Sequence, residues 1–171
     1  MKIPKRYKDA DLEQIEPSAR KEVFDLLGKK KSFMLFGDVG TGKTHTAYAI
    51  AKHMNQPTEP KVKVMNLPET MSYLRENMTL GLIETQLRFQ EEIGFTKYLV
   101  LDDLGAEKAT DWAKETIYSI INHRYEEMLP TIVTSNLSLG QLSSHLGERI
   151  ASRLAEMCEV VELSGKDRRL D

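Results

Sequence analysis

One segment, FMLFGDVGTGKTHTAYAIAKHM from Phe33 to Met54, constrains the fold of this chain more than any other. It begins with a short apolar run that predicts a buried strand. The loop that follows matches the pattern G-x-x-x-x-G-K-[ST], and a helical stripe of small apolar residues comes directly after it. A strand, a glycine-rich loop and a helix in immediate succession predict an α/β protein in which the loop connects a sheet to a helix.

The residue types of this loop are those that hold phosphate groups. Glycines let the backbone approach a ligand closely and turn successive N–H groups inward, and the N-terminus of the helix adds partial positive charge. Lys43 is expected to reach the β- and γ-phosphates, and Thr44 to offer its hydroxyl to Mg²⁺. An accidental glycine-rich turn is the alternative, but the strand and helix on either side disfavour it. The predicted nucleotide contacts are Gly37, Asp38, Val39, Gly40, Thr41, Gly42, Lys43, Thr44 and His45.

Composition narrows the class of protein that carries this loop. The chain has 171 residues, enough for one domain, and a formal net charge of −2 that shows no overall basic excess for nucleic acid. Its single cysteine, Cys158, lies in an apolar stretch and is expected to be a buried core residue. No signal peptide or bilayer-length apolar run is found, so we expect a cytoplasmic protein without a membrane partner.

Strand and helix patterns alternate along the chain. The expected strands are 31–37, 61–66, 97–103, 130–136 and 158–163. Helical patterns lie between them, so the alternation predicts a parallel sheet covered by helices. Residues 1–16 are expected to form an N-terminal arm that lies on the domain, and residues 17–171 to form the domain itself.

Two carboxylates end the third predicted strand, beside the expected position of the glycine loop. Asp102 is predicted to hold Mg²⁺ through water. Asp103 has two interpretations, since it either orients or deprotonates the attacking water or caps the following turn. Glu107 is a second candidate base, although its place in a loop is more typical of a solvated side chain.

Asn136 ends the fourth predicted strand and is expected to direct its side-chain amide at the γ-phosphate or the attacking water. Ser135 or Thr134 are alternatives for this role. The other interpretation of Asn136 is structural, because asparagine after a strand is a common turn former.

Arg149 and Arg153 lie four residues apart in a predicted helix, and like charges at this spacing repel each other slightly. An anion in front of the pair would explain the spacing, so we hypothesise that Arg153 reaches a γ-phosphate bound by a neighbouring subunit and that Arg149 assists. The alternative is a solvated surface pair such as Arg153 with Glu156.

Four segments occur in order and at domain-scale spacing: GDVGTGKTHTAYAIA, YLVLDDLGAEK, TIVTSN and GERIASRL. In this combination the chain resembles the AAA+ ATPase domain of the DnaC/DnaI-type bacterial helicase loaders and the similar IstB-type transposition helpers. The resemblance implies a P-loop three-layer sandwich with a five-stranded parallel sheet. No separate helical lid is expected, because the sequence ends shortly after the fifth predicted strand.

The resemblance further implies an ATP-dependent oligomeric switch. ATP and Mg²⁺ would bind between the subunits of a homo-oligomer that engages single-stranded DNA or a DNA-bound partner. In the loaders this partner is the replicative hexameric helicase. The residues that would take the catalytic roles are Lys43, Asp102, Asp103, Asn136 and Arg153, with Thr44 and Asp102 at the metal and Arg149 as a further nucleotide contact.

The resemblance also suggests less specific sites. Tyr7 in the arm would border the adenine, and Arg168 or Arg169 would contact phosphate. Candidate DNA contacts in the helical region 68–93 are Tyr73, Arg75, Arg88 and Phe89. Core packing is the alternative for the two aromatic residues, because Phe89 falls on a predicted apolar stripe.

Three functions are compatible with these features. The first is an ATPase that loads or remodels a helicase on DNA, and its transposition-helper version differs in the client protein. The second is a small-molecule P-loop kinase. The third is an interaction module that binds nucleotide and barely hydrolyses it, which the short side chain of Asp103 leaves open.

Overall fold

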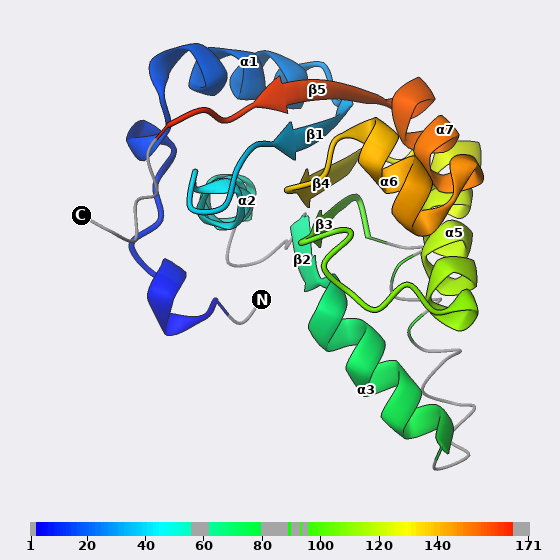
Figure 1. Ribbon diagram of the computed structural model, residues 1–171. Coiled ribbons are helices and arrows are strands. Elements are labelled where there is room, and N and C mark those ends of the chain that lie inside the picture. The colour runs from blue at the N-terminus through cyan, green and yellow to red at the C-terminus, as the bar shows by residue number, and fades with distance from the viewer. Residues whose placement is uncertain (1–2, 56–61, 80–88, 90–92, 94–95, 166–171) are drawn as a thin grey trace.

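The computed structural model describes residues 3–55, 62–79, 89, 93 and 96–165. One sheet has the strand order β2-β3-β4-β1-β5, and all of its neighbouring strands run parallel (Figure 1). The strands are β1 (Ser32–Phe36), β2 (Val62–Asn66), β3 (Tyr98–Asp102), β4 (Thr131–Ser135) and β5 (Cys158–Glu162). The predicted five-stranded parallel sheet is therefore confirmed.

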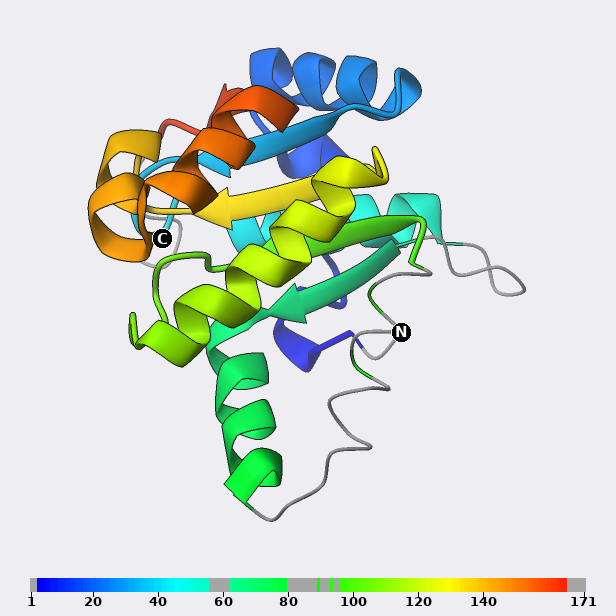
Figure 2. The same ribbon diagram turned by 90° about the vertical axis from the view of Figure 1, so that its right-hand side faces the viewer.

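Helices cover both faces of the sheet and complete three layers (Figure 2). The helices α1 and α2 pack with the arm on one face, and α5, α6 and α7 pack on the other. Their bounds are α1 (Pro17–Gly28), α2 (Lys43–Met54), α3 (Leu67–Thr79), α5 (Asp111–Glu126), α6 (Leu139–Leu146) and α7 (Glu148–Met157). The described residues include no separate helical lid, and none of their helices has the length and apolar character to cross a bilayer.

Gly147 separates the last helical region, residues 139–157, into two helices. The apolar pattern of residues 139–157 is compatible with one helix or two, and the structure has two, because the chain turns at Gly147 with φ 108°. Within the helical region 68–93, the apolar stripe that contains Phe89 predicts a separate helix from Gly81 to Ile93, and most of these residues lie outside the described ones. Phe89 and Ile93, the described members of its apolar stripe, both contribute to the core.

The strand order brings together segments that are far apart in the sequence. Strand β4 lies between β1 and β3, with Phe33 paired to Ile132 and Val100 paired to Ile132 in register. Because parallel strands end at the same edge of a sheet, the ends of these three strands become neighbours there. The glycine loop directly follows β1, Asn136 directly follows β4, and Asp102 is the last residue of β3.

The arm packs against α1 and α2 through apolar contacts. Its residues Ala10, Leu12 and Ile15 are buried in the core cluster that contains α1 and α2. Lys52 of α2 also donates hydrogen bonds from Nζ to the carbonyl oxygens of Lys8 and Ala10, at 2.6 and 2.8 Å. The division into an arm of residues 1–16 and a domain of residues 17–171 remains a prediction.

One arginine is completely buried at the other edge of the sheet. Arg124 of α5 donates to Thr131 Oγ1 at 2.7 Å and to the carbonyl oxygens of Ile93, Thr96 and Pro130 at 3.0, 3.2 and 2.8 Å. Burial lowers the pKa of Arg124 to about 10. These four hydrogen bonds join the segments that precede β3 and β4.

Candidate nucleotide-binding site

The glycine loop crosses from β1 to α2 in a conformation that requires glycine. A Cβ atom at Gly37 would lie 2.2 Å from the carbonyl oxygen of Leu163. The two segments approach closely because the Leu163 N–H donates to the Phe36 carbonyl at 2.7 Å. Gly42 has φ 93° and caps α2, so the unpaired N–H groups of the first helical turn open toward the loop.

Lys43 projects into this loop and not into solvent. Its side chain is buried, and Nζ donates to the carbonyl oxygens of Gly37 and Asp38 at 2.8 and 2.7 Å. The ammonium group therefore lies inside the ring of backbone that the sequence assigns to phosphate. An anion entering the loop would replace weak carbonyl acceptors with charged oxygens.

The hydroxyl of Thr44 and the carboxylate of Asp102, the two groups predicted to hold Mg²⁺, lie within hydrogen-bond distance of each other. Thr44 Oγ1 donates to Asp102 Oδ1 at 3.0 Å, and Thr134 Oγ1 donates to the same oxygen at 2.7 Å. The Asn66 side chain at the end of β2 also donates to Asp102. A hydroxyl beside a carboxylate fits Mg²⁺, which takes one or two protein oxygens and completes its shell with water and phosphate.

Burial sets the charge of Asp102. Its exposed fraction is 1%, and this burial raises the pKa of the carboxyl from an ordinary 3.8 to about 6. The hydrogen bonds from Thr134 and Thr44 oppose the shift, and the charge of Asp103 adds to it. Ionisation of this carboxyl is unfavourable in the free protein, and a nearby divalent cation would favour the ionised form.

A pH-dependent effect on stability follows from this shift. The folded Asp102 holds its proton more tightly than the unfolded chain does, so ionisation destabilises the fold as pH rises from about 4 to about 6. With Mg²⁺ chelated, Asp102→Asn should therefore raise the free energy of unfolding at pH 7.5 by about 1–3 kcal/mol, given about 1.4 kcal/mol per pKa unit. Near pH 4 the difference should vanish. Urea unfolding at both pH values tests this, and an equal difference at both would contradict it.

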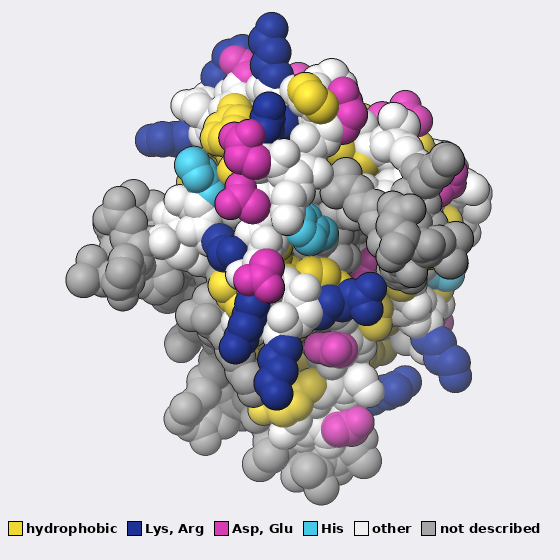
Figure 3. All heavy atoms as spheres, turned by 90° about the vertical axis from the view of Figure 1, so that its left-hand side faces the viewer, with side chains coloured by type: hydrophobic (Ala, Val, Ile, Leu, Met, Phe, Trp, Pro, Cys, Tyr) yellow, Lys and Arg dark blue, Asp and Glu magenta, His cyan; other side chains and the backbone are white. Residues whose placement is uncertain are grey.

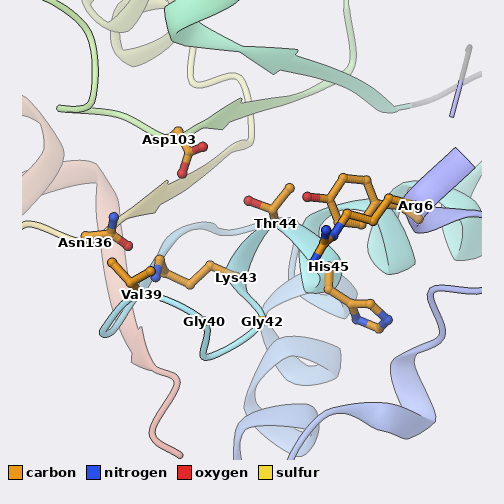
Figure 4. A pocket seen from close by; sticks show the side chains of 10 residues that line it. Arg6, Val39, Gly40, Gly42, Lys43, Thr44, His45, Asp103 and Asn136 are labelled. Atoms are coloured by element: carbon orange, nitrogen blue, oxygen red, sulfur yellow. The ribbon is translucent and has the colours of Figure 1, made fainter. Parts of the chain in front are cut away.

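Asp103 and Asn136 lie on the opposite side of the pocket from α2. The pocket is lined by Arg6, Tyr7, Val39, Gly40, Gly42, Lys43, Thr44, His45, Asp103 and Asn136. Figure 4 shows Asp103 and Asn136 extending from the ends of β3 and β4 toward the loop that carries Lys43. The Asp103 N–H donates to Thr134 Oγ1 at 2.9 Å, and its φ of 61° turns the chain sharply there. Both side chains therefore face the space in front of the glycine loop.

The arm contributes two residues to this pocket. Tyr7 was expected near the base, and it lines the pocket with its ring stacked on Tyr48, 4.6 Å between centroids. Arg6 was missed, and Figure 4 places its side chain beside Thr44 and His45. The cluster KRYK was a signal for Arg6, but only the packing of the arm shows that the side chain reaches the loop.

The interpretation of Glu107 as a solvated loop residue is wrong. Its exposed fraction is 6%, and its carboxylate accepts a hydrogen bond from the Gly105 N–H at 3.1 Å. Burial raises the pKa of Glu107. It lines a different hollow, between α3 and the start of α5, so the structure does not bring it into the nucleotide pocket as a second base.

Arg149 and Arg153 lie together on α7, away from the glycine loop. The described residues that line the nucleotide pocket include none from α5 or α7, and Figure 1 shows these helices on the right while the strands point left. Arg153 is 3.9 Å from Glu156, the surface pair considered as the alternative. Within one chain, neither arginine lines the phosphate loop.

The candidate DNA contacts divide into exposed and packed residues. Tyr73 is 58% exposed on α3, so core packing is wrong as its explanation. Phe89 packs against the core, as the apolar stripe predicted. Arg88, Arg168 and Arg169 lie outside the described residues.

The face toward which the strands point carries both signs of charge. Figure 3 shows basic side chains in the middle of this face, interspersed with acidic and histidine side chains. This mixture agrees with the formal net charge of −2. Recognition of phosphate on this face therefore depends on the pocket and not on a broad basic surface.

Sequence comparison matches nearly the whole chain to one family. Residues 5–171 match the family model described as IstB-like ATP binding protein. The chain is 31% identical over 155 residues to the replicative helicase loader DnaI of Bacillus subtilis, covering 83% of this chain and 49% of that protein. It is 28% identical over 137 residues to the replicative helicase loader DnaC of Escherichia coli, covering 80% and 55%. The chain thus spans about half the length of these relatives.

Solved structures agree with this relationship. The crystal structure of the DnaC helicase loader superposes with a TM-score of 0.80 at 29% identity, covering 94% of this chain and 100% of that one. The replication initiator DnaA bound to AMPPCP and single-stranded DNA superposes with a TM-score of 0.78 at 20% identity, covering 93% and 51%. The second likeness concerns the fold alone.

Proposed function

Because the chain belongs to the family of IstB-like ATP binding proteins, we propose that it is an AAA+ ATPase that acts as a switch in DNA replication. ATP and Mg²⁺ bind at the glycine loop, and hydrolysis occurs between two subunits of a homo-oligomer. The oligomer engages single-stranded DNA, a replicative helicase or both. Similarity to the loaders DnaI and DnaC supports this choice of client.

The observation that carries the proposal is the hydrogen bond of 3.0 Å between Thr44 and Asp102. It joins the end of the phosphate loop to the end of β3, so Thr44 and Asp102 are the residues that would hold a cation there. Mg²⁺ would supply charge neutralisation at the β- and γ-phosphates. Lys43 binds the same phosphates from inside the loop.

The remaining pocket residues provide the hydrolytic chemistry. Asp103 accepts a proton from, or orients, the water that attacks the γ-phosphorus. Asn136 holds the γ-phosphate or this water through its side-chain amide. As the new P–O bond forms, the bond between the γ-phosphorus and the bridging oxygen breaks, and ADP leaves with phosphate.

A second subunit completes the site in this proposal. The developing charge on the γ-phosphate needs a cation opposite Lys43, and the arginines of α7 do not line the pocket of their own chain. An arginine supplied by a neighbour typically accelerates phosphoryl transfer by about 10³–10⁵-fold. Arg153, with Arg149 beside it, is our assignment for this role.

The transposition-helper alternative shares this chemistry and differs in the client. The IstB-like family description supports keeping it. Retention of a purified replicative helicase by the ATP-bound protein would favour the loader, whereas retention of a transposase in its place would favour the helper.

The exposed tyrosine of α3 supports contact with single-stranded DNA. Stacking of a base on an aromatic side chain is worth about 1–3 kcal/mol, so Tyr73→Ala should weaken binding of an oligonucleotide by about 5–150-fold. Fluorescence anisotropy with a labelled single strand and a non-hydrolysable ATP analogue measures this. Phe24→Ala is a matched control, because Phe24 is 40% exposed on α1, a helix without a proposed DNA role. Equal loss in both variants, or in neither, would exclude Tyr73 as a specific contact.

A further inference from the structure

Arg149 and Arg153 of α7 pack on a stripe of two tyrosines and one asparagine. Tyr118, Asn122 and Tyr125 follow one another at helical spacing on α5, and α7 lies alongside that helix (Figure 2). The Arg149 guanidinium lies over the Tyr118 ring at 4.1 Å from the centroid, and Arg153 lies over the Tyr125 ring at 4.4 Å. Each arginine therefore makes a cation–π contact with a different tyrosine.

Asn122 connects the two stacked pairs. Its Oδ1 accepts a hydrogen bond from Tyr118 Oη at 3.3 Å and another from Arg153 Nε at 3.2 Å. The Tyr125 hydroxyl donates to Glu156 on α7, which is also 3.9 Å from Arg153. One network thus fixes the orientation of both guanidinium groups relative to α5.

The two arginines are held to different degrees. Arg153 has a ring, an amide oxygen and a carboxylate around it, and its side chain is 34% exposed. Arg149 is exposed, and within the described part of the chain its guanidinium makes no hydrogen bond or ion pair. The open hollow in front of them is lined by Tyr118, Glu148, Arg149, Ser152 and Arg153.

We infer that Tyr118, Asn122 and Tyr125 are positioning residues that hold Arg149 and Arg153 ready for a triphosphate bound by a second copy of this chain. This inference rests on the proposed function. The aromatic faces attract the guanidinium groups without using their N–H donors, so the donors that face outward stay available for phosphate oxygens.

The expected effect is on turnover and not on nucleotide affinity. A cation–π contact of this exposure shifts a conformational population by about two- to fivefold. Tyr118→Leu should therefore lower the turnover number for ATP about two- to fivefold while the KM for ATP changes less than about twofold. Tyr118→Phe keeps the ring face and should recover most of the turnover. Ser119→Ala, an exposed position on the same helix, serves as the control.

Mixing experiments separate positioning from folding. Lys43→Ala keeps Arg149 and Arg153 but has a defective phosphate loop. Arg153→Ala keeps the phosphate loop but lacks the arginine that a neighbouring subunit would supply. When Tyr118→Leu is mixed with Lys43→Ala, the turnover per Tyr118→Leu subunit should rise, because Lys43→Ala supplies well-positioned arginines. When it is mixed with Arg153→Ala, the turnover should not rise. A variant that is merely less stable would also have a defective phosphate loop, so mixing it with Lys43→Ala would not restore ATP turnover.

Three results would overturn the inference. If Lys43→Ala and Arg153→Ala rescue each other but Tyr118→Leu equals the unmodified protein, the tyrosine does not position the arginines and the proposed function stands. If Tyr118→Leu is defective but neither mixture restores it, the contact is structural only. If Lys43→Ala and Arg153→Ala fail to rescue each other, the shared site itself is wrong and the inference fails with it.

Discussion

Lys43→Ala is expected to lower the affinity for ATP by about a hundredfold or more and to abolish turnover. The buried ammonium group lies inside the phosphate loop, with Nζ 2.7–2.8 Å from two of its carbonyl oxygens. Charge-assisted hydrogen bonds to phosphate are each worth about 1.5–3 kcal/mol, and about 1.4 kcal/mol corresponds to tenfold in affinity. Titration with a fluorescent ATP analogue measures the loss.

Lys29→Ala is the matched control for this variant. Lys29 is exposed and pairs with Asp25 on the surface of α1, so its removal should leave the affinity for ATP unchanged. Thermal unfolding of both variants checks that the fold is intact. A folded Lys43→Ala protein that binds ATP as tightly as the unmodified chain would contradict the assignment of the loop.

Arg124→Met should lower the free energy of unfolding by about 3 kcal/mol. It would leave the carbonyl oxygens of Ile93, Thr96 and Pro130 without the donors they have in the fold. A buried acceptor left unpaired costs about 1–3 kcal/mol, while removal of a buried charge returns part of that cost. Arg124→Lys should recover only part of the loss, because one ammonium group cannot reach all four acceptors.

Urea unfolding measures this effect, with Lys21→Met as the comparison because Lys21 is an exposed residue on α1. A loss below about 1 kcal/mol for Arg124→Met would mean that water or neighbouring donors replace the guanidinium, since buried carbonyl groups are costly to leave unpaired.

Local sequence patterns predicted the strands and helices because each of these elements depends mainly on neighbouring residues. The glycine loop must sit between a strand and a helix, and Gly42 has the left-handed conformation that such a loop end needs. The central strands β1, β3 and β4 have buried interiors, as strands covered on both faces should, whereas the edge strands β2 and β5 also carry charged side chains. Their order in the sheet is set by packing between distant segments, and no local pattern specifies it.

Side chains placed by distant contacts were harder to predict. Glu107 was interpreted as a solvated residue because it lies in a predicted loop, but the turn at Gly105 and the packing of α3 and α5 bury it. Arg6 reaches the pocket only because the arm folds back onto α2. Tyr118 and Tyr125 meet the arginines of α7 across two helices, so their spacing becomes meaningful only in the folded chain.

The central claim is that the ATPase site is shared between two subunits. The measurement that tests it most directly is ATP turnover per subunit across a wide range of protein concentration, for the unmodified chain and for mixtures of Lys43→Ala with Arg153→Ala. We predict that turnover rises with concentration and that the two inactive variants restore activity together. Turnover that is independent of concentration, with a mixture that stays inactive, would contradict the account and show that each chain carries a complete site.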